Sequence, residues 1–153
     1  MAGRKLLDEN WQDGFFAWTY MNLIIGIFPI MMTISLYFLG EYTIDVYEYF
    51  IGLLPDLLLL VFTVCVNICF YIIGLNGEKI SATHKVLKIF FPFLLALGTL
   101  IVYAFLYSDV CQPEIHISVA KLVFFVLNMV LFIICYMRFY LTWKQLYSDS
   151  EQG

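Results

Sequence analysis

The stretch that decides the fold runs from Tyr49 to Gly74 and reads YFIGLLPDLLLLVFTVCVNICFYIIG. A helix that crosses a bilayer needs about 20 predominantly apolar residues, and this run is longer than that. Most of it is Leu, Val, Ile and Phe, and Asp56 is its one charged residue. The stretch therefore predicts a helix that spans a membrane.

Small and polar residues recur in this stretch at helical spacing. Successive members lie four, seven, four and seven positions apart, which aligns them along one face of a helix; they are Gly52, Asp56, Thr63, Asn67 and Gly74. A carboxylate, a hydroxyl or an amide in hydrocarbon raises the free energy unless it faces protein or water. We therefore expect this face to be buried against other helices or to line a cavity.

The composition of the whole chain indicates the same class of protein. Of its 153 residues, 63% are hydrophobic and 13% are charged, and the mean hydropathy is +0.88. Soluble domains carry roughly 25% charged residues, so this chain has little room for a soluble domain. It has neither a basic tract nor a glycine-rich phosphate loop, so we expect no direct nucleic-acid binding.

Four apolar runs predict an all-α integral membrane protein, a bundle of four transmembrane helices. The predicted spans are residues 15–40, 49–74, 89–108 and 119–143, between a cytoplasmic lead of residues 1–14 and a cytoplasmic tail of residues 144–153. Pro29 falls in the middle of the first span and is expected to kink it. Pro92 is expected in the first turn of the third span, where a missing N–H matters little.

The distribution of lysine and arginine predicts the orientation. With the N-terminus in the cytoplasm, seven of the eight basic residues lie inside and only Lys121 lies toward the outside. Cytoplasmic loops are enriched in Lys and Arg. We therefore expect both termini and the loop between the second and third spans to be cytoplasmic, in a multi-pass protein of the cell inner membrane.

A polar network inside the membrane is predicted from five side chains: Asp56, Thr63, Asn67, Lys121 and Asn128. Asp56 and Lys121 are expected at similar depths, where an ion pair would lower the cost of either charge. The two asparagines lie near mid-membrane and can hydrogen-bond across helices. Further members are offered by the first span, in Asn22, Thr33 and Ser35. The network is either a proton or ion relay headed by Asp56 or a set of contacts that fixes helix register, and we favour the second interpretation.

The loop between the second and third spans, residues 75–88, is basic. Four of its residues are expected to face a cytoplasmic partner: Lys79, His84, Lys85 and Lys88. Neither His84 nor His116 has a partner at catalytic spacing, and both are interpreted as solvated surface residues.

No residue pattern indicates an enzyme, a cofactor or a metal site. There is no serine, histidine and acid arrangement and no HExxH sequence. The four cysteines, Cys65, Cys69, Cys111 and Cys135, lack the paired spacing of a zinc site. Three of them lie in predicted spans and are expected to pack helices, whereas Cys111 lies in an external loop, where it is a candidate for a bridge between molecules.

These features leave two functions open. The first is a non-enzymatic membrane subunit that forms a homo-oligomer in the lipid bilayer and senses, anchors or signals to a cytosolic protein partner. The second is a small oligomeric channel or transporter that uses the polar face of the second span. A pore usually requires polar residues at several depths, and this face supplies only Asp56, Thr63 and Asn67.

In span count, size and short loops, the chain resembles the small four-span membrane subunits of bacterial anti-phage defence systems, such as the membrane component of Kiwa. The resemblance is one of architecture over the whole chain, and no motif carries it, so it implies no site residue. It implies an inner-membrane oligomer that senses a membrane disturbance and transmits it to a cytosolic DNA-binding partner. This favours the first function, as a sensor or scaffold in antiviral defence.

Overall fold

The computed structural model describes residues 2–39, 46–75, 81–111 and 117–149, and within them the side chains of residues 12–36, 38–39, 50–75, 81–111 and 117–147. This part of the chain forms four helices: α1 (Ala2–Leu39), α2 (Val46–Gly74), α3 (Ala82–Val110) and α4 (Val119–Asp149). Each contains a segment long and apolar enough to cross a membrane, namely Gln12–Leu36, Phe50–Gly74, Ala82–Val110 and Val119–Tyr147. The predicted all-helical architecture with four candidate spans is confirmed, and it indicates a multi-pass membrane protein.

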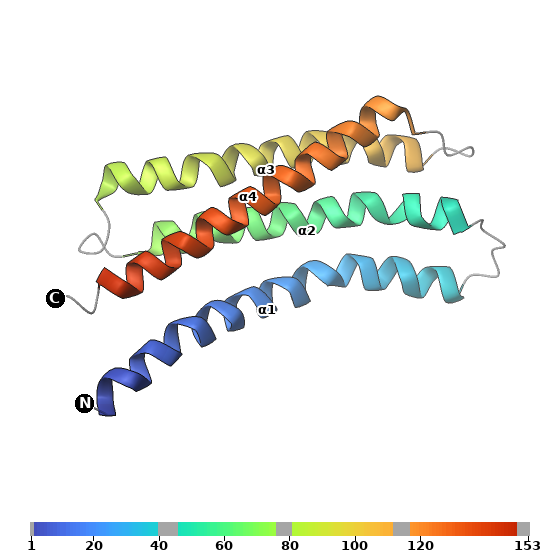
Figure 1. The fold of residues 1–153 in the computed structure, drawn as a ribbon. Coiled ribbons are helices and arrows are strands. Elements are labelled where there is room, and N and C mark those ends of the chain that lie inside the picture. The colour runs from blue at the N-terminus through green and yellow to red at the C-terminus, as the bar shows by residue number, and fades with distance from the viewer. Residues whose placement is uncertain (1, 40–45, 76–80, 112–116, 150–153) are drawn as a thin grey trace.

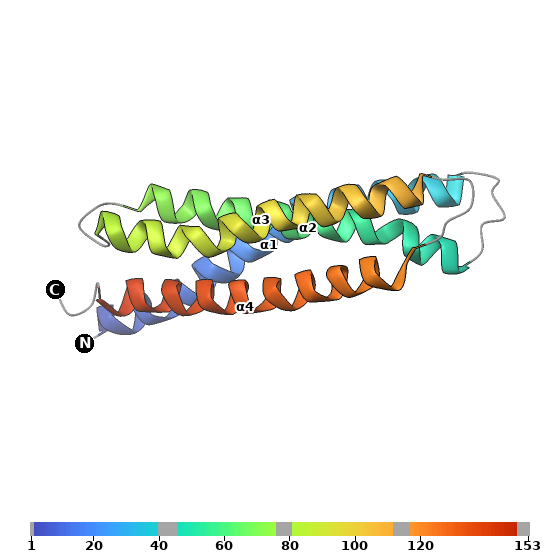
Figure 2. The same ribbon diagram turned by 90° about the horizontal axis from the view of Figure 1, so that it is seen from above.

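The helices α1, α2 and α3 lie next to one another, and α4 lies across them (Figure 1). The helices α3 and α4 are close together where α3 ends and α4 begins, and they diverge toward the other end, where α4 approaches α1 (Figures 1 and 2). At that other end α1 begins, α2 ends, α3 begins and α4 ends. We call it the terminal end, and the end where α3 meets α4 the opposite end.

The helices extend beyond the predicted spans. The helix α1 is continuous from Ala2, so the boundary expected at residue 15 does not interrupt it. The helix α3 begins at Ala82, seven residues earlier than expected, because Ser81 precedes it in an extended conformation and Ser81 O accepts from the N–H of Lys85 at 3.0 Å. The prediction that Pro92 lies in the first turn is therefore wrong, since Pro92 lies inside α3.

Pro29 lies inside α1, as predicted. Proline cannot donate the hydrogen bond of a helix interior, and its ring crowds the preceding turn, so it bends a helix. In Figure 1 the course of α1 is bent: its first part rises toward α2 and its second part runs beside α2. The bend allows the first part of α1 to reach α4.

A close approach between α1 and α2 occurs at Gly26. A Cβ atom placed on Gly26 would lie 2.9 Å from Cγ and 3.3 Å from Cβ of Leu60, closer than carbon atoms normally approach. Small residues at helix interfaces let two backbones come together, and in membranes such packing is a main source of helix association. Glycine at position 26 therefore sets the separation of α1 and α2.

The core consists of two apolar clusters. The larger one extends toward the terminal end and is rich in aromatic rings: Trp143 stacks on Tyr71 with ring centroids 4.4 Å apart and meets Phe15 edge-on at 5.5 Å. The smaller one, nearer the opposite end, is built on Leu58, Leu106 and Phe125. We call the rings of the larger cluster that join α1, α2 and α4 the aromatic cluster; they are Phe15, Trp18, Tyr71, Phe139 and Trp143.

Candidate functional site

The predicted polar face of α2 is covered only in part: Asp56, Thr63 and Asn67 are half-buried, whereas Gly74 is exposed. The hydroxyl of Thr33 donates to Oδ2 of Asp56 at 2.5 Å, and Nδ2 of Asn67 donates to Oδ1 of Asn22. Both contacts join α1 to α2, as expected for Asn22 and Thr33. Thr63, in contrast, donates to the carbonyl oxygen of Leu59 in its own helix at 2.8 Å, so it forms no link between helices.

A second polar contact joins α3 to α4. The buried hydroxyl of Thr99 lies 2.7 Å from the carbonyl oxygen of Leu95 and 3.1 Å from Oδ1 of Asn128, and it can donate to either. Asn128 is 5% exposed, and its contact with Thr99 joins α4 to α3, as expected for its position. Ser35 does not join any of these contacts, because its hydroxyl donates to the carbonyl oxygen of Met31 one turn earlier.

The predicted ion pair between Asp56 and Lys121 is not formed. The ammonium of Lys121 lies 2.7 Å from both carboxylate oxygens of Asp109 and 3.3 Å from the carbonyl oxygen of Phe105. The physical reason is the length of α3, which continues to Val110 and so places Asp109 in its last turn, beside the first turn of α4. Asp56 meets Thr33 instead, and the predicted single network is a set of separate pairs.

The four basic-loop residues predicted to face a partner have different surroundings. Nδ1 of His84 lies 2.7 Å from the hydroxyl of Ser81, and His84 is exposed in the first turn of α3. The ammonium of Lys85 donates to the carbonyl oxygen of Leu75, which ties the start of α3 to the end of α2. Lys88 lines a cavity between helices, and Lys79 lies outside the described residues.

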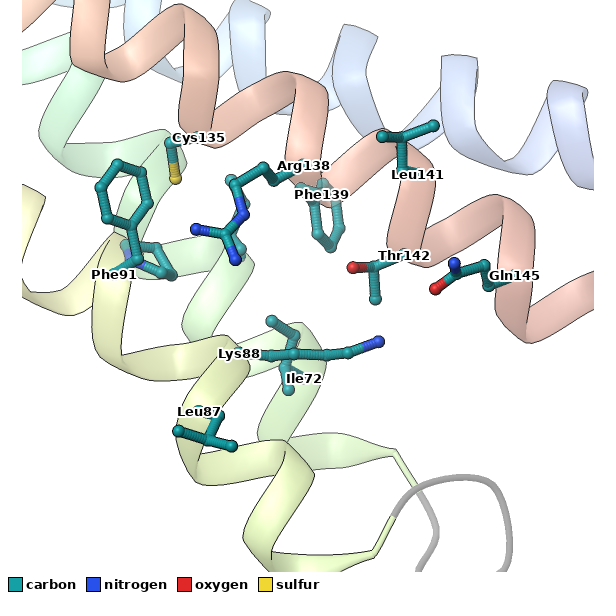
Figure 3. A pocket seen from close by; sticks show the side chains of 12 residues that line it. Ile72, Leu87, Lys88, Phe91, Cys135, Arg138, Phe139, Leu141, Thr142 and Gln145 are labelled. Atoms are coloured by element: carbon teal, nitrogen blue, oxygen red, sulfur yellow. The ribbon is translucent and has the colours of Figure 1, made fainter.

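The cavity beside Lys88 lies toward the terminal end, where α3 and α4 diverge (Figure 3). Its volume is about 250 Å³, and it is open on one side. Four of its lining side chains are polar: Lys88, Arg138, Thr142 and Gln145. The others are Ile68, Ile72, Leu87, Phe91, Pro92, Cys135, Phe139 and Leu141. We call this space the basic cavity.

Two cations of different helices share the basic cavity. In Figure 3 Lys88 extends from α3 toward Thr142 and Gln145 on α4, while the guanidinium of Arg138 extends from α4 toward Phe91 on α3. The guanidinium carbon lies 5.5 Å from the centroid of the Phe91 ring, a cation–π contact. Within the described residues neither Lys88 nor Arg138 forms an ion pair. The two positive charges therefore repel each other, and a negatively charged group in the cavity would relieve that repulsion.

The sequence offered one signal for this cavity that our expectations missed. Arg138, Thr142 and Gln145 follow one another at four and three positions, the spacing of one helical face. The predicted fourth span ends at residue 143, which leaves Gln145 in the tail and apart from the other two. Because α4 continues to Asp149, the three residues lie on one face of the same helix. Lys88 lines the same cavity as this face because of the way α3 and α4 diverge. The residue pattern of a single helix does not predict that divergence.

The three cysteines expected to pack helices are buried, as predicted, whereas the external location expected for Cys111 stays a prediction. Cys65, Cys69 and Cys135 are buried and free, and Cys111 is exposed and free. No group of three His, Cys, Asp or Glu side chains among the described residues could hold a metal ion.

No protein-family model, curated protein or solved structure matches this chain.

Proposed function

We propose that this chain is a non-enzymatic membrane subunit that forms a homo-oligomer in the bilayer and senses, anchors or signals to a cytosolic protein partner. The observation that carries the proposal is the pairing of polar side chains between helices: Thr33 with Asp56, Asn22 with Asn67, and Thr99 with Asn128. Such contacts hold membrane helices together. Polar residues used in this way serve assembly of the bundle rather than passage of a substrate.

The same pairing disfavours the channel interpretation. The pairs lie between different helices, two between α1 and α2 and one between α3 and α4. Asn22 and Asn128 line separate cavities of about 230 and 280 Å³ whose other walls are mainly aromatic and aliphatic. A water-filled path needs polar groups in continuous succession at several depths, and this arrangement does not supply them.

The placement of the helix ends supports a partner on one side. The start of α1, the end of α4 and the ends of α2 and α3 lie together at the terminal end (Figure 1). The excess of Lys and Arg in the corresponding segments supports a cytoplasmic location of this end, because cytoplasmic segments are enriched in these residues. A soluble partner there can contact several helix ends at once. The four-span architecture resembles membrane subunits of anti-phage defence systems, and a role in such a system is part of the proposal.

The test is co-purification with the products of the flanking genes after extraction in detergent, combined with native mass determination. We expect a homo-oligomer of defined subunit number that retains one soluble protein at fixed stoichiometry. The same preparation, reconstituted in liposomes, should carry no ion or proton flux above empty liposomes. Measurable flux without a retained protein would support the channel function instead.

A pair of variants with equal change in charge makes the test specific to the terminal end. His84→Glu and Ser108→Glu each add one negative charge at an exposed position, the first at the terminal end and the second at the opposite end. If the partner binds the basic loop, His84→Glu should weaken its retention because it reduces the positive field there. Equal retention by both variants would exclude this loop as the binding surface.

A further inference from the structure

We propose that the basic cavity binds a phosphate ester group, with Lys88 and Arg138 as its cationic ligands. This goes beyond the proposed function, because the binding needs no protein partner. It concerns a site on the chain itself, between α3 and α4 at the terminal end.

The basic cavity holds two positive charges that no carboxylate balances among the described residues. Lys88 follows the start of α3 by six residues, or roughly 9 Å along the helix axis, and Arg138 belongs to the apolar part of α4. Cations in such positions are usually paired with a carboxylate or with another anion. Lys121 at the opposite end follows that rule through Asp109, whereas Lys88 and Arg138 have no carboxylate partner among the described residues. The missing counter-charge is thus expected from a ligand.

The donors around the cavity favour phosphate over a simple carboxylate. The guanidinium of Arg138 is a planar fork that can donate two hydrogen bonds to one anion, and the ammonium of Lys88 adds a compact charge from the facing helix. The hydroxyl of Thr142 and the amide of Gln145 lie on the same wall as Arg138. A carboxylate has two oxygens in one plane, which Arg138 alone can satisfy. A tetrahedral phosphate group presents oxygens toward both helices at once.

The walls of the cavity favour a phospholipid as the source of that phosphate. Leu87 and Leu141 line the cavity and are 66% and 53% exposed, so apolar surface continues from the cavity to the outside of the bundle. The cavity volume of about 250 Å³ suits a headgroup rather than a whole ligand of drug size, which takes roughly 300 to 1,000 Å³. Basic pockets between membrane helices near the cytoplasmic surface bind anionic headgroups in this way. A soluble phosphate ester could supply the same chemistry from the aqueous side.

The experiment measures ligand binding to the purified full chain in an uncharged detergent by native mass spectrometry. The probes are phosphatidylglycerol, phosphatidylcholine, glycerol 3-phosphate and palmitate. Phosphatidylglycerol and glycerol 3-phosphate separate a lipid source from a soluble one. Phosphatidylcholine carries phosphate without net negative charge, and palmitate carries negative charge without phosphate.

We expect Arg138→Gln and Lys88→Gln each to weaken binding of phosphatidylglycerol about tenfold, because each removes a charge-assisted hydrogen bond to the ligand. Arg138→Lys should retain part of the affinity, since it keeps the charge but loses the fork. The matched control is Lys144→Gln, which removes the same charge from an exposed position outside the cavity lining and should leave the affinity within about twofold.

Each outcome decides for or against the site. Binding of phosphatidylglycerol or of glycerol 3-phosphate that is weakened about tenfold in each cavity variant and stays within about twofold in Lys144→Gln supports the site and identifies the source of the phosphate. Failure of both phosphate probes to bind, affinities unchanged in the cavity variants, or palmitate bound as tightly with the same dependence on Arg138 would overturn it. If Arg138→Gln does not fold, Lys88→Gln against Lys144→Gln carries the test alone. Since no partner protein is present, a negative result here leaves the proposed partner binding untouched.

Discussion

At the opposite end of the bundle Lys121 lies 2.7 Å from both oxygens of Asp109, whereas at the terminal end Lys88 and Arg138 share a cavity and form no ion pair within the described residues. The packing also differs. The terminal end is held by stacked and edge-on aromatic rings from three helices, while a small aliphatic cluster with Phe125 accompanies the ion pair at the other.

This difference separates cations that serve the fold from cations that are available to a ligand. Lys121 neutralises a carboxylate of the adjacent helix and so joins the start of α4 to the end of α3. The terminal end is packed by aromatic rings, and Lys88 and Arg138 there have no carboxylate partner among the described residues. Neutralising Lys121 at the opposite end should therefore lower stability, whereas neutralising Lys88 or Arg138 at the terminal end should weaken ligand binding.

The largest effect is expected from breaking the aromatic cluster. Trp143 is 4% exposed and contacts rings of both α1 and α2, so Trp143→Ala should lower the free energy of unfolding by about 3 to 5 kcal/mol. Denaturant titration in mixed micelles measures this. The control is Ile133→Ala, which truncates a side chain of the same helix that is 60% exposed. Equal losses in the two variants would show that the terminal end does not depend on ring packing.

The next effect concerns the contact between α1 and α2. Gly26→Ala places a methyl group against Leu60 and should lower the free energy of unfolding by about 1 to 3 kcal/mol, because overpacking displaces the neighbouring side chain or helix. Gly98→Ala is the matched substitution, since no atom lies within 4 Å of its Cβ position. It should be neutral or stabilising by up to about 1 kcal/mol, as alanine is the better helix former. The same denaturation measurement decides, and a loss in Gly98→Ala as large as that in Gly26→Ala would contradict the assignment.

A third comparison tests the two classes of cation directly. Lys121→Gln leaves Asp109 without its partner and should cost about 2 kcal/mol of stability. Arg138→Gln removes the same charge and, among the described residues, breaks the contact with Phe91, so its cost should be about 0.5 kcal/mol. Thermal or denaturant unfolding of the two proteins, side by side, provides the measurement. The separation into structural and ligand-binding cations fails if Arg138→Gln proves the more destabilising.

The smallest expected effect resolves the partners of Asp56. A double-mutant cycle of Thr33→Val and Asp56→Leu should give a coupling free energy of about 0.6 kcal/mol, the average for polar contacts between membrane helices. A second cycle of Asp56→Leu and Lys121→Gln should be additive, because Lys121 bonds to Asp109 instead. Coupling in the second cycle and none in the first would contradict the contact of Asp56 with Thr33 and support the predicted ion pair of Asp56 with Lys121.

The sequence predicts helix number and position well because length and hydropathy alone decide whether a segment can span a membrane. It also predicts that Asn67 and Asp56 form hydrogen bonds or ion pairs with other side chains, since an unpaired polar group in hydrocarbon raises the free energy. It does not predict which partner each residue meets. Hydropathy ends the third span at Ser108 and so predicts a loop at Asp109, whereas α3 is two residues longer and brings Asp109 beside Lys121.

The basic cavity was missed for a related reason. Its cations belong to two helices, and each alone resembles an ordinary interfacial residue. Only the divergence of α3 from α4 opens a space that both can reach. Crossing geometry depends on side chains of all four helices together, including small residues such as Gly26 at the contact of α1 with α2.

The divergence of α3 and α4 places the basic cavity beside the part of α4 that the aromatic cluster holds against α1 and α2. Phe139 belongs to both: it lines the cavity, and its ring centroid lies 4.8 Å from that of Trp18 on α1. The wall of the cavity and the anchor of α4 thus share a side chain, so a substitution that loosens the aromatic cluster is expected to alter the shape of the cavity as well.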